Sequence, residues 1–314
     1  MKHRICFLIP QFGVLPNYIH YFIHSASYRN STMDFYFFTD QKIKFSKFIQ
    51  NVFVVNLTFK AFNELACKKL NHSFVIHNAY KLCDLKPMYG LILEDYIKSY
   101  SHWGYCDYDI IIGDVEKMLR INNFIDYEIF CVQQSYASGP FQIYKNEKKC
   151  NELFKKSSSW KTVLNEKSNQ LFDEAGDVIR EIWKGKDIKE CKGKIISMTH
   201  LLKDEALMES LKIKVHMKEL IKEDFQDNTV LTFKQGKLVS NKTQNEIYIY
   251  HFMNRKNRIL FNDHLFSKEI NQFQFTRYGF TLSNNFAMGM GLILSFIKRL
   301  EIRALRKLRT MIFN

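Results

Sequence analysis

The sequence predicts an α/β fold in which a mainly parallel sheet is flanked by helices. Three observations lead to this prediction. Short runs rich in β-branched and aromatic residues alternate along the chain with longer segments of helical spacing. The 314 residues are 46% hydrophobic, with 4 Pro and 12 Gly, as in a globular protein with a sizeable core. Neither an internal repeat nor a low-complexity linker interrupts the pattern.

The first half of the chain should supply much of this sheet. The run ICFLIP at 5–10 has the length and composition of a buried strand. A helix should follow, because Pro16 favours a helix start and the apolar residues 18, 19, 22 and 23 have helical spacing. By the same criteria, the other expected strands are 34–40, 51–57 and 108–114, and the other expected helices are 84–100 and 116–125.

The second half begins with two more expected strands, at 128–134 and 140–146. Residues 147–225 have a mostly helical pattern. The segment 228–242 predicts a hairpin that turns at the Lys-Gln-Gly sequence, and 246–256 contains one more strand.

The charge balance narrows the classes of partner. Lys and Arg outnumber Asp and Glu by 46 to 32, a formal net charge of +14, which suits nucleotides, nucleic acid or an acidic membrane face. The 7 cysteines are scattered without a C-x-x-C pair, which is typical of reduced thiols in the cytosol. The apolar run at the N-terminus is interrupted at Pro10, too early for a signal peptide.

Two acids, Asp107 and Asp109, precede the apolar run at 110–112. Acids two apart in a strand point the same way, so the pair could hold Mg²⁺ or Mn²⁺ through hard oxygen ligands. The alternative is structural: Asp107 would cap a turn and Asp109 would be merely exposed.

Several motifs together resemble an uncharacterised family of bacterial proteins from polysaccharide-synthesis loci, which are similar to glycosyltransferases of the GT-A fold. The resemblance covers about residues 1–256. It departs from the family where relatives have a Gly-His pair and this chain has Ser138, Gly139 and Pro140. The motifs are IPQFGVLPNY (9–18), FYFFTD (35–40), YKLCDLKPMYG (80–90), HWGYCDYDIIIGD (102–114), IYKN (143–146), FDEAG (172–176) and IYIYHFMNRK (247–256).

The resemblance implies that the D-x-D motif holds a metal on a nucleotide-sugar diphosphate. The first loop would wrap the base, with Phe12 stacking on it and Gly13 permitting close approach. Lys86 would neutralise the diphosphate, and Asp84 would bind sugar hydroxyls. The alternatives are an ordinary βα turn for the loop, and a helix cap by Asp84 beside a solvated lysine. The remaining implied donor contacts are Pro10, Gln11, Thr39, Asp40, Lys81 and Tyr108.

His251 resembles the late histidine that retaining GT-A enzymes use as a third metal ligand. Imidazole would favour Mn²⁺ over Mg²⁺. Arg255 and Lys256 would then clamp phosphate. The alternative is a histidine packed in the core.

Asp173 and Glu174 would face the acceptor, or instead cap and begin a helix. Inversion and retention both stay open, with the late histidine favouring retention.

The last segment, 284–314, carries six basic residues against Glu301. Its apolar run 289–297 is shorter than the roughly 20 residues that span a bilayer. The pattern predicts an amphipathic helix on an anionic membrane surface, or a terminal helix packed on the domain.

These observations predict a catalytic domain at 1–256, with about 1–125 binding the nucleotide sugar and about 126–256 facing the acceptor and completing the metal site. A basic helical tail at 257–314 would hold the enzyme at the inner face of the bacterial membrane. The expected activity is metal-dependent hexosyl transfer from a UDP-sugar to a surface glycan such as O-antigen or capsule, on a lipid-linked acceptor. A nucleotidyltransferase using the same metal site and a basic nucleic-acid-binding protein are the alternatives. The sequence has no nucleic-acid-binding signature and lacks the Gly-rich phosphate loop.

Overall fold

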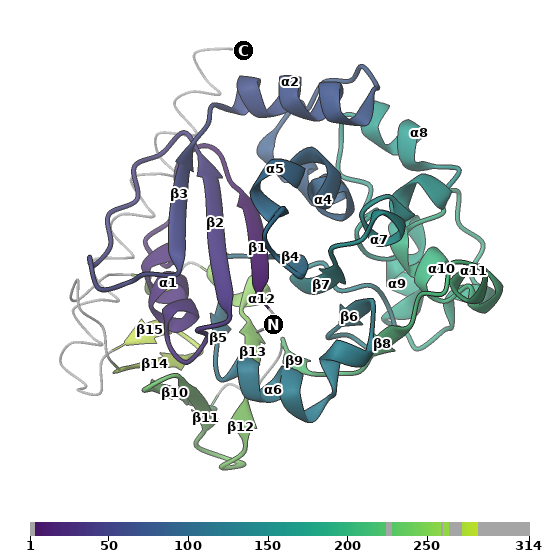
Figure 1. Ribbon diagram of the computed structural model, residues 1–314. Coiled ribbons are helices and arrows are strands. Elements are labelled where there is room, and N and C mark those ends of the chain that lie inside the picture. Colours follow the sequence, from purple (N-terminus) through teal and green to yellow (C-terminus); the bar gives the residue numbers. More distant parts are fainter. Residues whose placement is uncertain (1–3, 224–227, 259, 264–271, 282–314) are drawn as a thin grey trace, which may run out of the picture.

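The computed structural model describes residues 4–223, 228–258, 260–263 and 272–281. It confirms a mixed α/β fold with a large, mostly parallel central sheet flanked by helices (Figure 1). The seven strands lie in the order β3-β2-β1-β4-β7-β6-β8, and β7 alone among them runs against its neighbours. The strands are β1 (Ile5–Pro10), β2 (Met33–Thr39), β3 (Val52–Asn56), β4 (His102–Cys106), β6 (Ile129–Cys131), β7 (Phe141–Lys145) and β8 (Val215–Met217).

Strand β1 shows why this sheet is covered on both faces. All of its residues are buried, and alternate side chains enter different apolar clusters. Ile5, Phe7 and Ile9 pack with α1 (Ile19–Ser27) on one face. Cys6 and Leu8 pack on the other face, in the cluster that holds α2 (Phe59–Leu70) and α4 (Tyr89–Ile92). Figure 1 shows these helices on opposite sides of the strands. The continuous apolar run therefore reflects burial on both faces.

The expected strand at 108–114 is wrong in its place and extent. The central strand is β4 (His102–Cys106), which pairs in parallel with β1. The chain then turns through 107–109, and β5 (Ile110–Ile112) enters a separate sheet, in the order β5-β13-β9, with β13 (Ile249–His251) and β9 (Ile221–Lys222). The two acids interrupt the apolar run and end one strand before the next begins. The D-x-D motif thus lies at the junction of two sheets.

A third sheet has the order β12-β11-β10-β14-β15. It confirms the predicted hairpin, whose turn residues Gln235 and Gly236 both have positive φ. Its strands are β10 (Leu231–Lys234), β11 (Lys237–Ser240), β12 (Glu246–Ile247), β14 (Gln272–Thr276) and β15 (Gly279–Thr281). The sequence did not predict the strands β14 and β15. Strand β14 stacks an aromatic ring against the hairpin, in the Phe233–Phe273 pair, whose ring centroids lie 4.8 Å apart.

The helices are mostly short. The expected helix at 84–100 is a series of single turns. Among the described residues 147–223, the expected mostly helical segment consists of short helices separated by loops, and it also contains the strands β8 and β9. The remaining α-helices are α3 (Leu82–Leu85), α5 (Glu94–Ile97), α6 (Val115–Ile121), α7 (Lys148–Asn151), α8 (Trp160–Asn165), α9 (Ile179–Ile182), α10 (Met198–Leu202), α11 (Glu205–Ser210) and α12 (Met253–Lys256). The 3₁₀ turns are η1 (Ala79–Lys81), η2 (Lys86–Met88), η3 (Phe124–Asp126), η4 (Leu153–Lys156), η5 (Gly176–Val178) and η6 (Ile188–Glu190).

Within the described part of the chain, no helix is long and apolar enough to cross a membrane. The predicted amphipathic segment at 284–314 lies outside the described residues.

Candidate functional site

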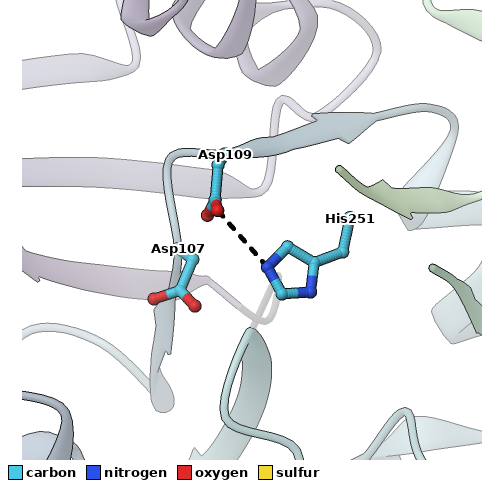
Figure 2. Close-up of side chains that lie close together, drawn as sticks. All are labelled: Asp107, Asp109 and His251. Atoms are coloured by element: carbon cyan, nitrogen blue, oxygen red, sulfur yellow. Dashed lines mark ion pairs between the residues drawn. The ribbon is translucent and has the colours of Figure 1, made fainter. Parts of the chain in front are cut away.

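Three possible metal ligands meet at the junction of the two sheets. Asp107 and Asp109 lie in the turn after β4, and His251 is the last residue of β13. The register of β13 on β5 pairs His251 with Ile110, and the Phe252 N–H donates to the Asp109 carbonyl at 3.1 Å. One ligand atom from each of Asp107, Asp109 and His251 lies within 4.8 Å of the others. Figure 2 shows the His251 ring facing the Asp109 carboxylate, with Asp107 beside it.

Both nitrogens of His251 face carboxylates. Nε2 lies 3.5 Å from Asp109 Oδ2, and Nδ1 donates to Glu223 Oε1 at 2.8 Å. Burial alone would lower the pKa of His251, but Asp109 and Glu223 outweigh it and raise the pKa to about 10. A ligand histidine is commonly oriented by a carboxylate on its other nitrogen, and Glu223 takes that place here.

The Asp109 carboxylate is buried and has two cationic neighbours. Lys256 Nζ donates to Asp109 Oδ2 at 2.5 Å, and His251 lies on the same oxygen. Burial alone would raise the pKa of Asp109, but His251 and Lys256 hold it below its ordinary value. Asp109 is therefore ionised, as a metal ligand must be.

The donor set fits a divalent cation such as Mn²⁺. Two carboxylates and one imidazole are acceptable to Mn²⁺, and Asp107, with 30% of its side chain exposed, leaves the site open on one side. The other coordination positions would fall to water or substrate oxygens. The Lys256 ammonium now neutralises Asp109, so a bound cation would take over that role and release the lysine.

Lys86 links this cluster to a second pair of acids. Its Nζ lies 2.7 Å from Asp107 Oδ1 and 3.5 Å from Asp173 Oδ2, and donates to the Gly139 carbonyl at 2.8 Å. Burial alone would lower the pKa of Lys86, but Asp107 and Asp173 outweigh it and raise it well above the ordinary value. The lysine is charged, and it bridges the two sides of a pocket of about 460 Å³.

Asp173 and Glu174 line that pocket opposite the D-x-D motif. Burial raises the pKa of Asp173 well above its usual range, and Lys86, at 3.5 Å, offsets only part of this effect. Burial also raises the pKa of Glu174, to about 7. Glu174 packs directly over Gly139, where an added Cβ would lie 2.3 Å from Glu174 Oε1. A carboxyl group poised near neutral pH can accept or hold a proton.

Lys81 and Asp84 were expected among the donor contacts, but neither lines the pocket. They form a buried ion pair with each other, in which Lys81 Nζ lies 2.8 Å from Asp84 Oδ2. Asp84 accepts hydrogen bonds from the backbone N–H groups of Gln170 and Phe172 at 2.8 and 2.9 Å. Lys81 Nζ donates to the carbonyls of Val163 and Ser168. The pair therefore ties the segment before Asp173 and Glu174 to the sheet side of the pocket.

The first loop is divided between pocket and core. Pro10 and Gln11 line the pocket. Phe12 is buried and packs against Phe59 and Phe62, so its ring is part of the core. The expected base-stacking role of Phe12 therefore does not fit its packing.

Beside this loop, Gly13 adopts a φ of 82° and its N–H donates to Asp40 Oδ1 at 3.2 Å. Asp40 is exposed, and Thr39 is buried with its hydroxyl accepting from the Gln41 N–H. Tyr108, between the two acids, lines the pocket and stacks on Tyr18 at 5.7 Å.

Arg255 is buried outside the pocket lining, whereas Lys256 lies in it. Sequence reasoning missed Glu223, because 28 residues separate it from His251 and the parallel pairing of β9 with β13 brings them together. It also missed the pocket aromatics Tyr80, Tyr136 and Trp183.

The family assignment rests on nearly the whole chain. A family of unknown function, DUF6625, matches residues 7–283. The chain belongs to DUF6625. A search of curated proteins found no match in sequence.

Two solved structures have a weak structural similarity to this chain. One is a protein from Desulfovibrio desulfuricans G20 described as a candidate nucleotide-diphospho-sugar transferase, at 9% identity and a TM-score of 0.32 over 68% of this chain and 79% of that chain.

The other is the glycosyltransferase GlyE of Streptococcus pneumoniae TIGR4, at 11% identity and a TM-score of 0.32. That likeness covers 72% of this chain and 56% of that chain. At such scores neither likeness bears on the activity of this DUF6625 protein, which has to be inferred from its own site.

Proposed function

We propose that this DUF6625 protein is a metal-dependent glycosyltransferase of GT-A type that moves a hexose from a nucleotide sugar to a bacterial surface glycan. One observation carries the proposal: Asp107, Asp109 and His251 converge in a pocket that also holds two lysines. Such a set suits a cation together with a diphosphate. The donor that we propose is a UDP-sugar.

The cation would supply charge neutralisation for the departing nucleoside diphosphate. Asp107, Asp109 and His251 would hold it. Lys256, freed from Asp109, would pair with a phosphate oxygen, because an ammonium group is a good point-charge partner for phosphate. Glu223 would keep the His251 ring oriented through Nδ1. Pro10 and Gln11, at the end of β1, would contact the nucleoside.

The acceptor would enter on the side of Asp173 and Glu174. In an inverting reaction, Glu174 would take the proton of the attacking hydroxyl, and its pKa of about 7 supports that role. In a retaining reaction, Glu174 would instead accept a hydrogen bond from a bound sugar. His251 resembles the late histidine that retaining GT-A enzymes use as a metal ligand, and this resemblance supports retention. The anomeric configuration of the product, read by proton NMR, separates the two.

The natural acceptor that we propose is a lipid-linked saccharide of an O-antigen or capsule pathway. The basic segment at 284–314 supports this, since it would place the protein at the inner face of the membrane.

The test is a screen of nucleotide sugars with the purified full chain, with and without Mn²⁺, following nucleotide release. We expect metal-dependent release from a UDP-sugar, and loss of that release in Asp109→Asn. Asp126→Asn, an exposed acid in η3, is the matched control and should behave as the parent. Titration calorimetry with UDP should show binding that requires the metal.

Two results would refute the proposal. One is the absence of any metal-dependent nucleotide binding. The other is tight, salt-sensitive binding of RNA without metal, which would favour the nucleic-acid-binding alternative. Release of pyrophosphate from a nucleoside triphosphate would favour the nucleotidyltransferase.

A further inference from the structure

Two exposed aromatic rings stand at the same pocket. Tyr80 and Trp183 have exposed fractions of 67% and 60%, and both line the pocket that contains Asp109. By contrast, Trp103 is completely buried. Single exposed apolar residues are normal on a protein surface, but two exposed aromatic rings at one pocket are typical of a binding site, because aromatic rings are frequent in pocket linings.

Both rings are held in place by buried structure behind them. Trp183 follows α9, whose Ile179 and Ile182 belong to a small separate core that includes Tyr136. Tyr136 of that core also lines the pocket beside Trp183. Tyr80 lies in η1, beside the buried Lys81. The exposure of the two rings therefore belongs to a fixed surface.

A buried polar group lies in the same pocket. Asp173 is 2% exposed, and its Oδ1 has no hydrogen-bond partner among the described residues. Burying a polar atom without a partner costs about 1–3 kcal/mol, so a ligand that bonds this atom would relieve a real penalty. Glu174 lies next to it in the chain and also lines the pocket.

An apolar ring surface beside buried carboxyl groups is complementary to a pyranose. One face of a pyranose ring presents C–H groups, which pack on an aromatic ring, while its hydroxyls reach polar groups at the edge. We infer that Trp183, with Tyr80 and Asp173, forms a subsite for a pyranose ring of the acceptor saccharide. The inference rests on the proposed transferase function, since it assigns the acceptor rather than the donor to this end of the pocket.

The position of the subsite distinguishes it from the donor site. The proposed donor residues are at the end of β1, where Pro10 is the last residue of the strand and Gln11 follows it. Lys256 lies beside the metal ligands, whereas Trp183 belongs to the segment after Glu174. Removing Trp183 should therefore weaken the binding of an acceptor sugar and leave nucleotide binding unchanged.

The test uses methyl β-D-galactopyranoside and methyl α-D-glucopyranoside as probes, with saturation-transfer NMR on the full chain in the presence of UDP and Mg²⁺. We expect saturation of the ring C–H protons of at least one probe. Trp183→Ala should weaken the binding of that probe about tenfold or more, as loss of a central aromatic contact does. Trp183→Phe should restore most of it. Phe48→Ala removes a ring that is 76% exposed outside this pocket and should change nothing.

Each other result overturns the inference. Equal probe saturation in the parent and Trp183→Ala would exclude the ring from the subsite, as would no saturation of either probe in the parent. A tenfold loss of UDP affinity in Trp183→Ala would assign the ring to the donor. If Trp183→Ala does not fold, the comparison of Trp183→Phe with Trp183→Gln decides in the same way. Failure of the proposed function would give a different pattern of results. If probe saturation depends on Trp183 but UDP binding does not require the metal, the sugar-binding subsite stands and the proposed transferase function is refuted.

Discussion

Metal binding at His251 should release a proton, and the number of protons tests whether this histidine is a ligand. In the metal-free protein, Asp109 and Glu223 raise the pKa of His251 to about 10 against the effect of burial. A ligand histidine must be neutral, so the cation has to displace that proton. At pH 7.5 we expect about one proton released for each Mn²⁺ bound.

The same pKa fixes how affinity changes with pH. Below pH 10 the proton competes fully, so the dissociation constant for Mn²⁺ should fall about tenfold between pH 7 and pH 8. A histidine with an ordinary pKa of 6.5 would release only about 0.2 proton at pH 7, and its affinity would change about 1.3-fold over that interval. The size of the effect therefore distinguishes the two environments.

The assay is titration calorimetry in buffers of different ionisation enthalpy, which gives the proton count directly. His251→Gln should abolish the release and weaken binding, and Glu223→Gln should lower the proton count by lowering the pKa. His216→Gln, at a buried histidine bonded to the Cys131 carbonyl instead, is the matched control. A proton count unchanged in His251→Gln would refute the assignment of His251 as a ligand.

Three further predictions concern the rest of the chain. Asp84→Asn breaks a buried ion pair and leaves Lys81 without its carboxylate. The free energy of unfolding, measured by urea denaturation, should therefore fall by about 3–5 kcal/mol. Stability equal to that of the parent would show that the Lys81–Asp84 pair does not stabilise the fold. Glu174→Gln tests whether this carboxyl, whose pKa burial raises to about 7, is the general base of an inverting reaction. In that case parent transfer should rise with pH up to about 7 as the group ionises, and the variant should lose that rise and about 100-fold or more of the rate. An unchanged pH profile in the variant would exclude Glu174 as the base. Deleting residues 285–314 should abolish binding to anionic vesicles in a sedimentation assay, because each basic residue near such a surface adds about 1 kcal/mol of binding energy. Nucleotide release by the truncated protein should persist. Vesicle binding by the truncated protein would show that this segment is not the membrane anchor.

His251 also links stability to pH in the metal-free protein. Because its pKa is raised from 6.5 to about 10, its ion pairs stabilise the fold fully below pH 6.5 and lose that contribution as the pH rises through 10.

The parallel half of the central sheet could be predicted from the sequence, because strands buried on both faces leave continuous apolar runs, as at 5–10. The prediction that 108–114 forms a strand of the central sheet was wrong, because the apolar residues of a strand do not indicate which sheet the strand belongs to. Strands of two or three residues, such as β9 (Ile221–Lys222), are too short to show a period. The helix α2 was missed although Thr58 caps it, its side chain accepting from the Ala61 N–H.

In the site, the D-x-D spacing and the late histidine pointed to groups that do converge. Local patterns could not separate Asp84 from a ligand-binding acid, because its burial depends on the segment 168–172 packing over it. Glu223 carries no local signal, since its role arises only from strand pairing.

The junction of the two sheets has a consequence for how the protein reaches its native state. The pairing of β5 with β13 joins segments about 140 residues apart, a contact of high loop-closure cost. The metal ligands are complete only once that pairing exists. A cation that binds them stabilises the closed junction over every state in which it is open. The cation that we propose for catalysis would thus also stabilise the pairing of β5 with β13. Removal of the metal would then destabilise the two smaller sheets before the parallel central sheet.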